Sequence, residues 1–416
     1  MPELPRTDEF DSTFALLREG YRFIPNRCEK LRTPGFRTRM MLREVVCVSG
    51  ADAARMFYTP ERFTRRRAIP MTTLTLLQDI GSVQTLDGAA HHRRKAMFMS
   101  MMTRESIARF ESCVADAWRR RLSQWQRAPR VMLAHEVRRV LCEAACLWAG
   151  LPPARCDFDA RTHEFAAMFD SAGSMGPKNW RAQLLRAKTE RWAQHVIEDI
   201  RAGALAVDAG SPVAVIASHC DESGALLPVK IATIELINLL RPTVAVERFI
   251  VYAALALHRW PEHREDIARD SEAALRFVQE VRRYFPFFAA VGGRALVPFE
   301  WQGRAFAPGD WVLLDIYGTH HDPQAWERPD EFAPSRFAGW RDEGFSLIPQ
   351  GGGVFDVGHR CAGEWATIAL LTRAVLMLAN DMDYAVPDQD LSIDLARMPA
   401  MPASGFVIEG VRSRLD

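Results

Sequence analysis

A glycine-rich loop that delivers one cysteine to the start of a helix constrains this chain more than any other feature. The loop covers residues 350–363, with the sequence QGGGVFDVGHRCAG, and an apolar run with helical period follows over residues 364–376. Glycines let the backbone approach a flat ligand, while amide groups and the positive end of a helix stabilise an anionic sulfur. Two interpretations remain open here. The loop either presents Cys361 as a thiolate ligand to haem iron, or cradles a phosphate beside a buried cysteine.

Composition limits the class of protein and its partners. The chain has 416 residues, of which 48% are hydrophobic, and its formal net charge is +1. This balance gives no electrostatic case for a nucleic acid or an acidic membrane surface, so we expect small-molecule partners. The eight cysteines form no C-x-x-C pair, which is typical of reduced thiols. No stretch has the composition of a linker, and we predict a single domain over residues 1–416.

The first residues of the chain bear on its location. Residues 1–12 are polar and acidic. This segment lacks the apolar core of a signal peptide and the ~20 apolar residues of a membrane anchor. We therefore expect a cytoplasmic protein without a membrane anchor.

Hydrophobic periodicity predicts a mainly helical protein with small sheets. Residues 105–200 read as almost wholly helical, with breaks near residues 150–153 and 174–177. Further helices are expected over residues 50–58, 96–110, 228–258 and 271–284. Short strands are expected over residues 36–42, 44–48, 296–301 and 311–315, and a small sheet with turns over residues 391–408.

The predicted long helix over residues 228–258 contains an Arg-Pro pair in an apolar stretch. Pro242 inside a helix removes one hydrogen bond and costs about 3 kcal/mol, so a kink is expected. An unpaired guanidinium is very unfavourable in apolar surroundings, and Arg241 therefore needs an anion. That anion is either a core Asp or Glu in an internal salt bridge, or a carboxylate ligand bound by two hydrogen bonds. The residues themselves leave both alternatives open.

A basic segment precedes the apolar run over residues 96–110. It has the sequence QTLDGAAHHRRK over residues 84–95, in which His91 and Lys95 share one helix face by their spacing. Such a pair can bind two carboxylates at the edge of a cofactor. The alternative is an ordinary solvated start of a basic helix.

Taken together, these elements resemble the cytochrome P450 superfamily across nearly the whole chain. Glu280-Val-Arg-Arg283 resembles the E-x-x-R helix, whose pair locks with an arginine such as Arg336. Residues 87–95 resemble the helix start that binds a haem propionate, although arginine is commoner where Lys95 stands. Cys361-Ala-Gly363 is similar to the C-x-G of the proximal loop. The resemblance implies a mainly α cytochrome P450 fold that holds b-type haem, with Cys361 as the iron's axial ligand.

Two departures from ordinary members narrow the resemblance. Val354 and Val357 stand where ordinary members have Phe and Gly, and Arg241-Pro242 occupies the region of the usual acid-threonine pair. Both resemble one branch, the bacterial fatty-acid peroxygenases and decarboxylases, which carry Q-G-G-G before G-H-R-C and L-L-R-P in the distal helix. The resemblance implies a long-chain fatty acid and hydrogen peroxide as partners, and no obligatory redox partner.

The same resemblance implies a mechanism and a set of site residues. Arg241 would hold the substrate carboxylate, which serves as general acid-base near the iron, while Pro242 shapes the distal helix. Hydroxylation at the alpha or beta carbon follows, with some decarboxylation to a terminal alkene. Gln84 stands where decarboxylating relatives carry histidine, so hydroxylation should predominate.

The remaining candidate residues surround the haem and the substrate. The expected haem-binding residues are Arg66, His91, Lys95, His359 and Cys361. The expected substrate contacts are Arg241, Gln84, Phe287, Phe288, Ala290 and Val291, the last four being alternatively plain core residues. Two other functions stay open, a monooxygenase that takes electrons from a redox partner and a haem-binding sensor without catalysis.

Overall fold

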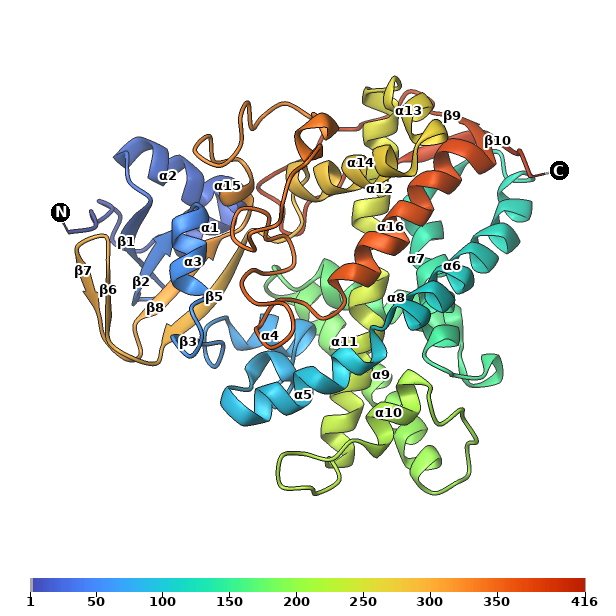
Figure 1. The fold of residues 1–416 in the computed structure, drawn as a ribbon, viewed down its shortest axis with the longest axis horizontal. Coiled ribbons are helices and arrows are strands. Elements are labelled where there is room, and N and C mark those ends of the chain that lie inside the picture. The colour runs from blue at the N-terminus through green and yellow to red at the C-terminus, as the bar shows by residue number, and fades with distance from the viewer. Residues whose placement is uncertain (1–2, 416) are drawn as a thin grey trace.

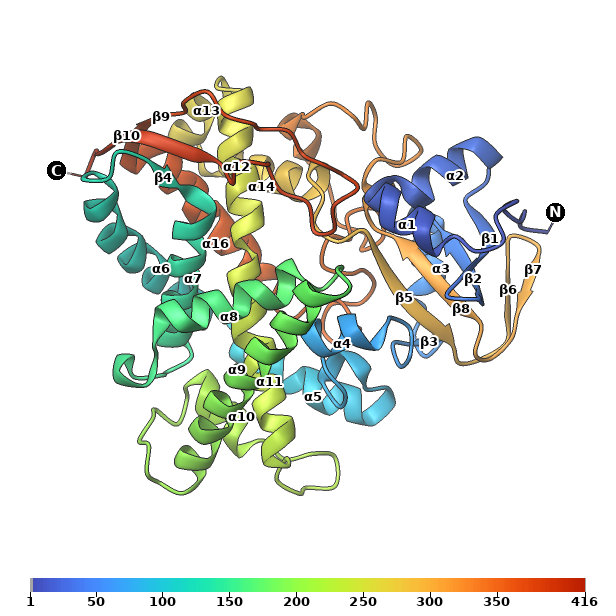
Figure 2. The same cartoon turned by 180° about the vertical axis from the view of Figure 1, so that it is seen from behind.

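Helices make up most of the protein, and a small sheet lies at one end of it (Figure 1). The computed structural model describes residues 3–415. The first described residues lie beside this sheet, and the C-terminal strand lies at the opposite end of the molecule in both views (Figures 1 and 2). Across the described residues, no helix combines the length and apolar character needed to cross a membrane.

The main sheet has five strands in the order β1-β2-β8-β5-β3. β1 (Gly35–Met40) and β2 (Arg43–Val48) form an antiparallel hairpin, and β2 pairs in parallel with β8 (Trp311–Asp315). β5 (Ala290–Ala295) and β3 (Phe63–Thr64) complete the sheet. Every residue of β8 is buried, as expected for a central strand covered on both faces. The sheet thus joins the N-terminal segment to the segment that follows α14.

Two smaller sheets lie apart from the main one. β4 (Val131–Met132), β10 (Val407–Ser413) and β9 (Met382–Ala385) form a three-stranded sheet at the C-terminal end. β6 (Phe299–Trp301) and β7 (Arg304–Phe306) form a two-stranded hairpin.

The helical body is built from sixteen α-helices within residues 3–415. The first seven are α1 (Thr13–Glu19), α2 (Phe23–Leu31), α3 (Ala51–Phe57), α4 (Met71–Leu77), α5 (Gly88–Met101), α6 (Arg104–Trp125) and α7 (Leu133–Trp148). The next five are α8 (Phe158–Asp170), α9 (Pro177–Arg201), α10 (Pro212–Ser218), α11 (Val229–Ala245) and α12 (Glu247–Arg259). The last four are α13 (His263–Arg269), α14 (Ser271–Tyr284), α15 (Tyr317–His320) and α16 (Glu364–Leu376).

The core is centred on α7, α11 and α12, with α6 and α16 packed around them. Residues 247–257 of α12 are all buried, and a helix that is buried on all sides must lie inside the body. Figure 2 shows α12 continuing the direction of α11 through the middle of the molecule. The segment carrying Arg241 therefore lies within the helical body, away from its surface.

Several predicted elements are confirmed, and their local signals explain why. α14, α16 and β8 have the predicted bounds, and the hairpin of β1 and β2 lies within a residue or two of its expected position. The Asp270 side chain accepts the amides of Glu272 and Ala273 at the start of α14, which fixes where that helix begins.

Other predictions were wrong in their boundaries. The expected helix over residues 228–258 is two helices, α11 and α12, which break at Val246 one turn after Pro242. The apolar run over residues 96–110 is also divided, because Thr103 caps α6 through the Ser106 amide. Five strands were not predicted, namely β3, β4, β5, β7 and β9. In residues 391–408, the start of β10 belongs to a named sheet, and Ile393 and Pro402 form an isolated bridge.

Candidate active site

The loop before α16 is shaped by its glycines and fixes the cysteine backbone. Gly351 and Gly353 have φ values of 93° and 78°, which favour glycine. A Cβ at Gly352 would lie 2.5 Å from the carbonyl oxygen of Gly344, so the close approach of these two backbones requires glycine. The Cys361 amide donates to the Gln350 carbonyl at 3.0 Å. Cys361 is therefore held at a defined place directly before α16.

The surroundings of the Cys361 sulfur combine burial with groups that stabilise a thiolate. Desolvation raises the pKa of the Cys361 thiol, while the Gly363 N–H, the Lys95 ammonium and the Gln350 side chain act in the opposite direction. The Gln350 amide is itself fixed by donating to Thr367 Oγ1 at 2.9 Å. A cation bound at the sulfur would complete this environment, because a metal-bound thiol is deprotonated.

A buried ion network that sequence reasoning missed anchors the first turn of α16. Glu364 is 2% exposed and accepts from Arg282 Nη2 and from Arg360 Nε, both at 2.5 Å. These two arginines come from α14 and from the loop itself. The network thus ties Arg360, the residue before Cys361, to α14 through Glu364. The sequence did not indicate that Arg282 and Arg360 would be buried among the other basic residues near them.

The expected lock of the E-x-x-R helix is confirmed. Arg283 donates from Nε and Nη2 to the two oxygens of Glu280 at 2.7 and 2.8 Å, and Arg336 Nε lies 3.2 Å from Glu280 Oε1. Both Glu280 and Arg283 are fully buried. The triad joins α14 to the segment 327–337 that leads toward the cysteine loop.

Two imidazole rings and a lysine from distant segments meet beside the loop. The ring centroids of His91 and His359 are 4.0 Å apart. His91 and Lys95 are buried, at 4% and 3% exposed, so the alternative of a solvated helix start is wrong. Burial first, and then the nearby cations, lower the pKa of His91 to about 4 and that of His359 to about 2. Such a concentration of positive potential and ring N–H groups suits one or two carboxylates.

The neighbouring arginines are placed differently from the sequence expectation. Arg66 donates from Nε to the Thr85 carbonyl at 2.9 Å, and its side chain is 62% exposed. Arg65, by contrast, is buried, donates to the Gly292 carbonyl at 3.0 Å and lowers the pKa of both imidazoles through its charge. The structure therefore adds Arg65 to this basic cluster, a residue that the run of three arginines did not single out.

Arg241 has no acidic partner within salt-bridge distance among residues 3–415, so the internal salt bridge is wrong. Its guanidinium donates to the carbonyl oxygens of Leu76 and Leu77 at the end of α4, and to Asn238 Oδ1 at 3.2 Å. Burial, with the charge of Arg186 adding to it, lowers the pKa of Arg241 to about 9. The carbonyl and amide dipoles orient this cation but do not neutralise its charge. A bound carboxylate would neutralise it.

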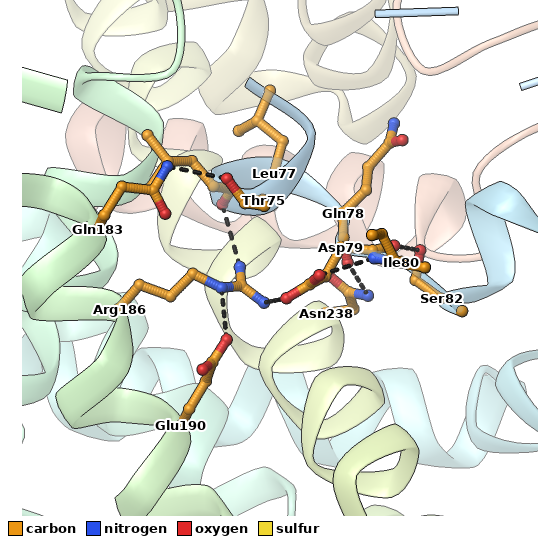
Figure 3. A network of polar contacts seen from close by, with 12 residues as sticks. Thr75, Leu77, Gln78, Asp79, Ile80, Ser82, Gln183, Arg186, Glu190 and Asn238 are labelled. Carbon is orange, nitrogen blue, oxygen red and sulfur yellow. Dashed lines mark hydrogen bonds and ion pairs between the residues drawn. The ribbon is translucent and has the colours of Figure 1, made fainter. Parts of the chain in front are cut away.

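A polar network surrounds Arg241 and ties α11 to the segment after α4. Asn238 donates to the Gln78 carbonyl at 3.0 Å and to Glu235 Oε2 at 3.3 Å. Glu235 is fully buried and pairs with Arg94 of α5 at 2.6 Å. Figure 3 shows Asn238 next to Gln78 and Asp79 in this network. Three separate elements, α4, α5 and α11, thus contribute to the network around Arg241, which has no acidic partner among the described residues.

The expected pocket residues occupy the segment from α14 into β5, together with the turn before α5. Phe287 stacks on Phe249 of α12 with ring centroids 4.3 Å apart, whereas Phe288 is 43% exposed. Ala290 and Val291 begin β5 and are partly buried. Gln84 Oε1 is buried and has no hydrogen-bond partner among the described residues. An unsatisfied buried acceptor is costly, so this oxygen can accept a hydrogen bond from a ligand, and the expected contact of Gln84 with the substrate stays a prediction.

Part of this chain is similar in sequence to known proteins. The family model described as Cytochrome P450 matches residues 274–365. Taurochenodeoxycholic 6 alpha-hydroxylase of Sus scrofa is 31% identical over 134 residues, which are 32% of this chain and 24% of that protein. Taxane 10-beta-hydroxylase of Taxus cuspidata is 30% identical over 138 residues, 32% of this chain and 26% of that protein. The matched region spans about a quarter of the length of these curated relatives.

Solved structures match the whole chain. A variant of cytochrome P450SP alpha (CYP152B1) has 42% sequence identity and a TM-score of 0.94, over 97% of this chain and 99% of that chain. The chain belongs to the cytochrome P450 family. Cytochrome P450EX alpha (CYP152N1), solved with myristic acid, has 38% identity and a TM-score of 0.95 over 100% of both chains. A variant of cytochrome P450 OleT in complex with arachidonic acid has 32% identity and a TM-score of 0.96, again over 100% of both chains.

Membership of this cytochrome P450 family confirms the predicted fold and identifies the cofactor as haem with a cysteine thiolate on its iron. The residues fit that group. Cys361 is the cysteine fixed before α16, and Lys95 and Gln350 act on its sulfur. In the cluster beside the loop, Arg65 and Lys95 are the cations, while the low pKa values keep His91 and His359 neutral, so that their rings can donate N–H groups to propionates.

Proposed function

We propose that this cytochrome P450 is a peroxygenase that hydroxylates long-chain fatty acids at the alpha or beta carbon with hydrogen peroxide. The observation that carries the proposal is Arg241, a buried guanidinium in the distal helix that no acidic side chain of residues 3–415 neutralises. The structural relatives solved with myristic acid and with arachidonic acid support a fatty acid as the ligand.

Arg241 can bind a carboxylate by exchanging one of its present hydrogen bonds. A guanidinium carries five N–H groups, and the three hydrogen bonds of Arg241 go to Leu76, Leu77 and Asn238. Because both Nη2–H groups are used, by Leu77 and Asn238, the groups left are Nε–H and one Nη1–H, which do not lie side by side. A carboxylate that takes over one of the two Nη2 bonds would be held by two adjacent N–H groups in a single orientation, with its alpha and beta carbons next to the carboxylate-binding end of the site.

The carboxylate also supplies the proton transfer that the distal helix otherwise lacks. Arg241-Pro242 replaces the acid-threonine pair of ordinary members, so no side chain of that pair can move a proton here. Cys361 would hold the haem through its thiolate, and the haem would supply an electron-rich iron that favours cleavage of the O–O bond. The substrate carboxylate, held by Arg241, would take the proton from one oxygen of peroxide and deliver it to the other oxygen, which leaves as water, a role worth about 10²–10⁴-fold in rate.

The remaining residues shape the site around this pair. Pro242 lies one residue after Arg241, where α11 is about to break, and thereby sets the course of the distal helix. The haem would be held by Cys361, His91, Lys95, His359 and Arg65. Arg66 lies outside this group, with its exposed side chain near Asp87. Gln84, Phe287, Phe288, Ala290 and Val291 would line the substrate path. Gln84 in place of histidine favours hydroxylation over decarboxylation.

The proposal includes the partners and the setting of the enzyme. It takes residues 1–416 as one haem-thiolate domain in the cytoplasm, with no obligatory redox partner. The absence of the acid-threonine pair argues against a monooxygenase that activates dioxygen with electrons from a reductase.

One turnover experiment separates the proposal from its alternatives. Purified holoenzyme is given a long-chain saturated fatty acid with hydrogen peroxide alone, or with a reductase system in the presence of catalase. Hydroxy acid formed with peroxide alone supports the proposal. Product only with the reductase would identify a monooxygenase, and binding without product under either condition would identify a haem-binding sensor.

A further inference from the structure

Two buried arginines from different helices converge on the C-terminal end of α4. Arg241 of α11 donates from Nη1 to the Leu76 carbonyl at 2.9 Å, and Arg186 of α9 donates from Nη1 to the same oxygen at 3.5 Å. Both side chains are buried, at 3% and 2% exposed for the whole residue. The two guanidinium groups therefore meet at one carbonyl oxygen, although only one of them has an acidic partner.

Arg186 holds that acidic partner through a different nitrogen. Its Nη2 lies 2.9 Å from Asp79 Oδ2, and its Nε donates to Glu190 at 2.8 Å. Figure 3 shows the Arg186 guanidinium between Asp79, Glu190 and the end of α4. The Asp79 side chain is only 16% exposed, so its carboxylate depends on this pairing for neutralisation.

Asp79 lies two residues after Leu77, whose carbonyl accepts from Arg241. It adopts a left-handed φ of 79°, and its Oδ1 accepts the Ile80 amide at 2.7 Å. Its charge acts on Arg241, since it raises the pKa of that guanidinium while Arg186 lowers it. Asp79 pairs with Arg186, which shares the Leu76 carbonyl with Arg241, and this makes Asp79 a candidate internal partner for Arg241.

We propose that Arg186 keeps the Asp79 carboxylate paired to itself and thereby leaves Arg241 open to the carboxylate of a fatty acid. Arg186 is then a positioning residue for carboxylate recognition, which acts through Asp79 and the Leu76 carbonyl. This inference rests on the proposed function, because it assigns a role to Arg186 only if Arg241 binds the substrate.

The expected effect follows from competition for one cation. Without Arg186, the Asp79 carboxylate gains from moving onto Arg241, and protein in that state does not bind a fatty acid. The apparent Kd rises by the factor by which the binding-competent fraction falls. A new contact as strong as an ordinary charge-assisted hydrogen bond corresponds to about tenfold or more in that Kd.

A double-mutant cycle on the holoenzyme tests the inference. Binding of a long-chain saturated acid and of the alcohol of equal length is measured from the haem absorbance for wild type, R186M, D79N and the R186M/D79N double variant. Asn tolerates the left-handed backbone at this position, so D79N removes the charge alone. R186M should raise the Kd of the acid about tenfold or more and that of the alcohol less than twofold. The double variant should return the acid to within about threefold of wild type.

A matched control removes the other carboxylate that Arg186 contacts. Glu190 pairs with Arg186 from the outer side and is 38% exposed, and E190Q does not release Asp79. The Kd of the acid should change less than twofold in E190Q. A second cycle uses R186Q, which keeps an amide donor but not the charge, and the R186Q/D79N double variant. This cycle carries the test if R186M does not retain haem.

The outcomes are distinguishable. If the double variants bind the acid as weakly as R186M and R186Q do, or if acid and alcohol weaken equally, Arg186 is an ion-pair and packing residue only and the inference is overturned. Failure of the proposed function gives another result, since R241A would then bind the acid as well as wild type does. Rescue by D79N is an outcome that a merely structural role of Arg186 does not produce.

Discussion

Removal of Glu280 should destabilise the protein by several kcal/mol, because four hydrogen bonds in the core end on this one carboxylate. It accepts from Arg283 at 2.7 and 2.8 Å, from the Ala333 amide at 2.8 Å and from Arg336 at 3.2 Å. Glu280→Ala leaves the fully buried Arg283 without its counter-charge, which costs about 3–5 kcal/mol. The orphaned Ala333 amide adds about 1–3 kcal/mol. We expect the free energy of unfolding to fall by at least about 4 kcal/mol.

Urea unfolding of the holoenzyme, followed by haem absorbance and tryptophan fluorescence, measures this change. The matched control is Glu265→Ala, which breaks the Arg269–Glu265 pair on the surface, where both side chains are 73% exposed. A pair of that kind is worth about 0–1 kcal/mol. Equal losses of stability in the two variants would show that burial of the Glu280 network contributes nothing, and would refute the reasoning.

Three further predictions concern the haem ligand, the product and pH. Cys361→Ala should abolish the red-shifted Soret band of the reduced protein with carbon monoxide, and a band that survives would contradict the ligand assignment. Hydroxy acid should exceed terminal alkene when products of a long saturated acid are separated by gas chromatography, because Gln84 replaces histidine; alkene as the main product would contradict this. Burial raises the pKa of Asp315 to about 7 from 3.8, so the folded state holds a proton that the unfolded chain loses between these values, and wild type loses stability as pH rises through this window. Asp315→Asn should therefore raise the free energy of unfolding more at pH 8 than at pH 5, which denaturant titrations at the two pH values check.

Sequence patterns predicted the elements whose signals are local. α14 begins where Asp270 caps it, and α16 begins directly after the glycine loop, so both helices have the predicted bounds. Glu280 and Arg283 are three residues apart on one helix and form the expected ion pair. The break at Val246 was missed because a proline signals a kink but not where the next helix begins.

Contacts between distant segments could not be predicted in the same way. Which arginine of residues 65–67 would be buried depends on β5, whose Gly292 carbonyl accepts from Arg65. Two of the three partners of Arg241 come from α4, and Asp79 pairs with Arg186, which lies 107 positions away in the chain. Nothing in the local composition distinguishes such a residue from a surface charge, so the network that orients Arg241 became visible only in the folded protein.

The central claim is that a carboxylate held by Arg241 takes part in the chemistry as well as in binding. Peroxide-driven product formation by wild type and Arg241→Ala, each with and without a short carboxylic acid, tests it most directly. The short acid fits beside Arg241 without presenting carbons for oxidation, and a neutral molecule serves as the reporter substrate.

Wild type should oxidise the neutral molecule only when the short acid is present, and Arg241→Ala should do so under neither condition. Turnover of fatty acid at saturation should fall about 10²–10⁴-fold in Arg241→Ala, since the positioned acid-base is lost together with the anchor. Arg241→Lys should recover only part of it, because an ammonium lacks the planar two-pronged geometry. Wild-type turnover of fatty acid by Arg241→Ala, or equal oxidation of the neutral molecule with and without the short acid, would contradict the account.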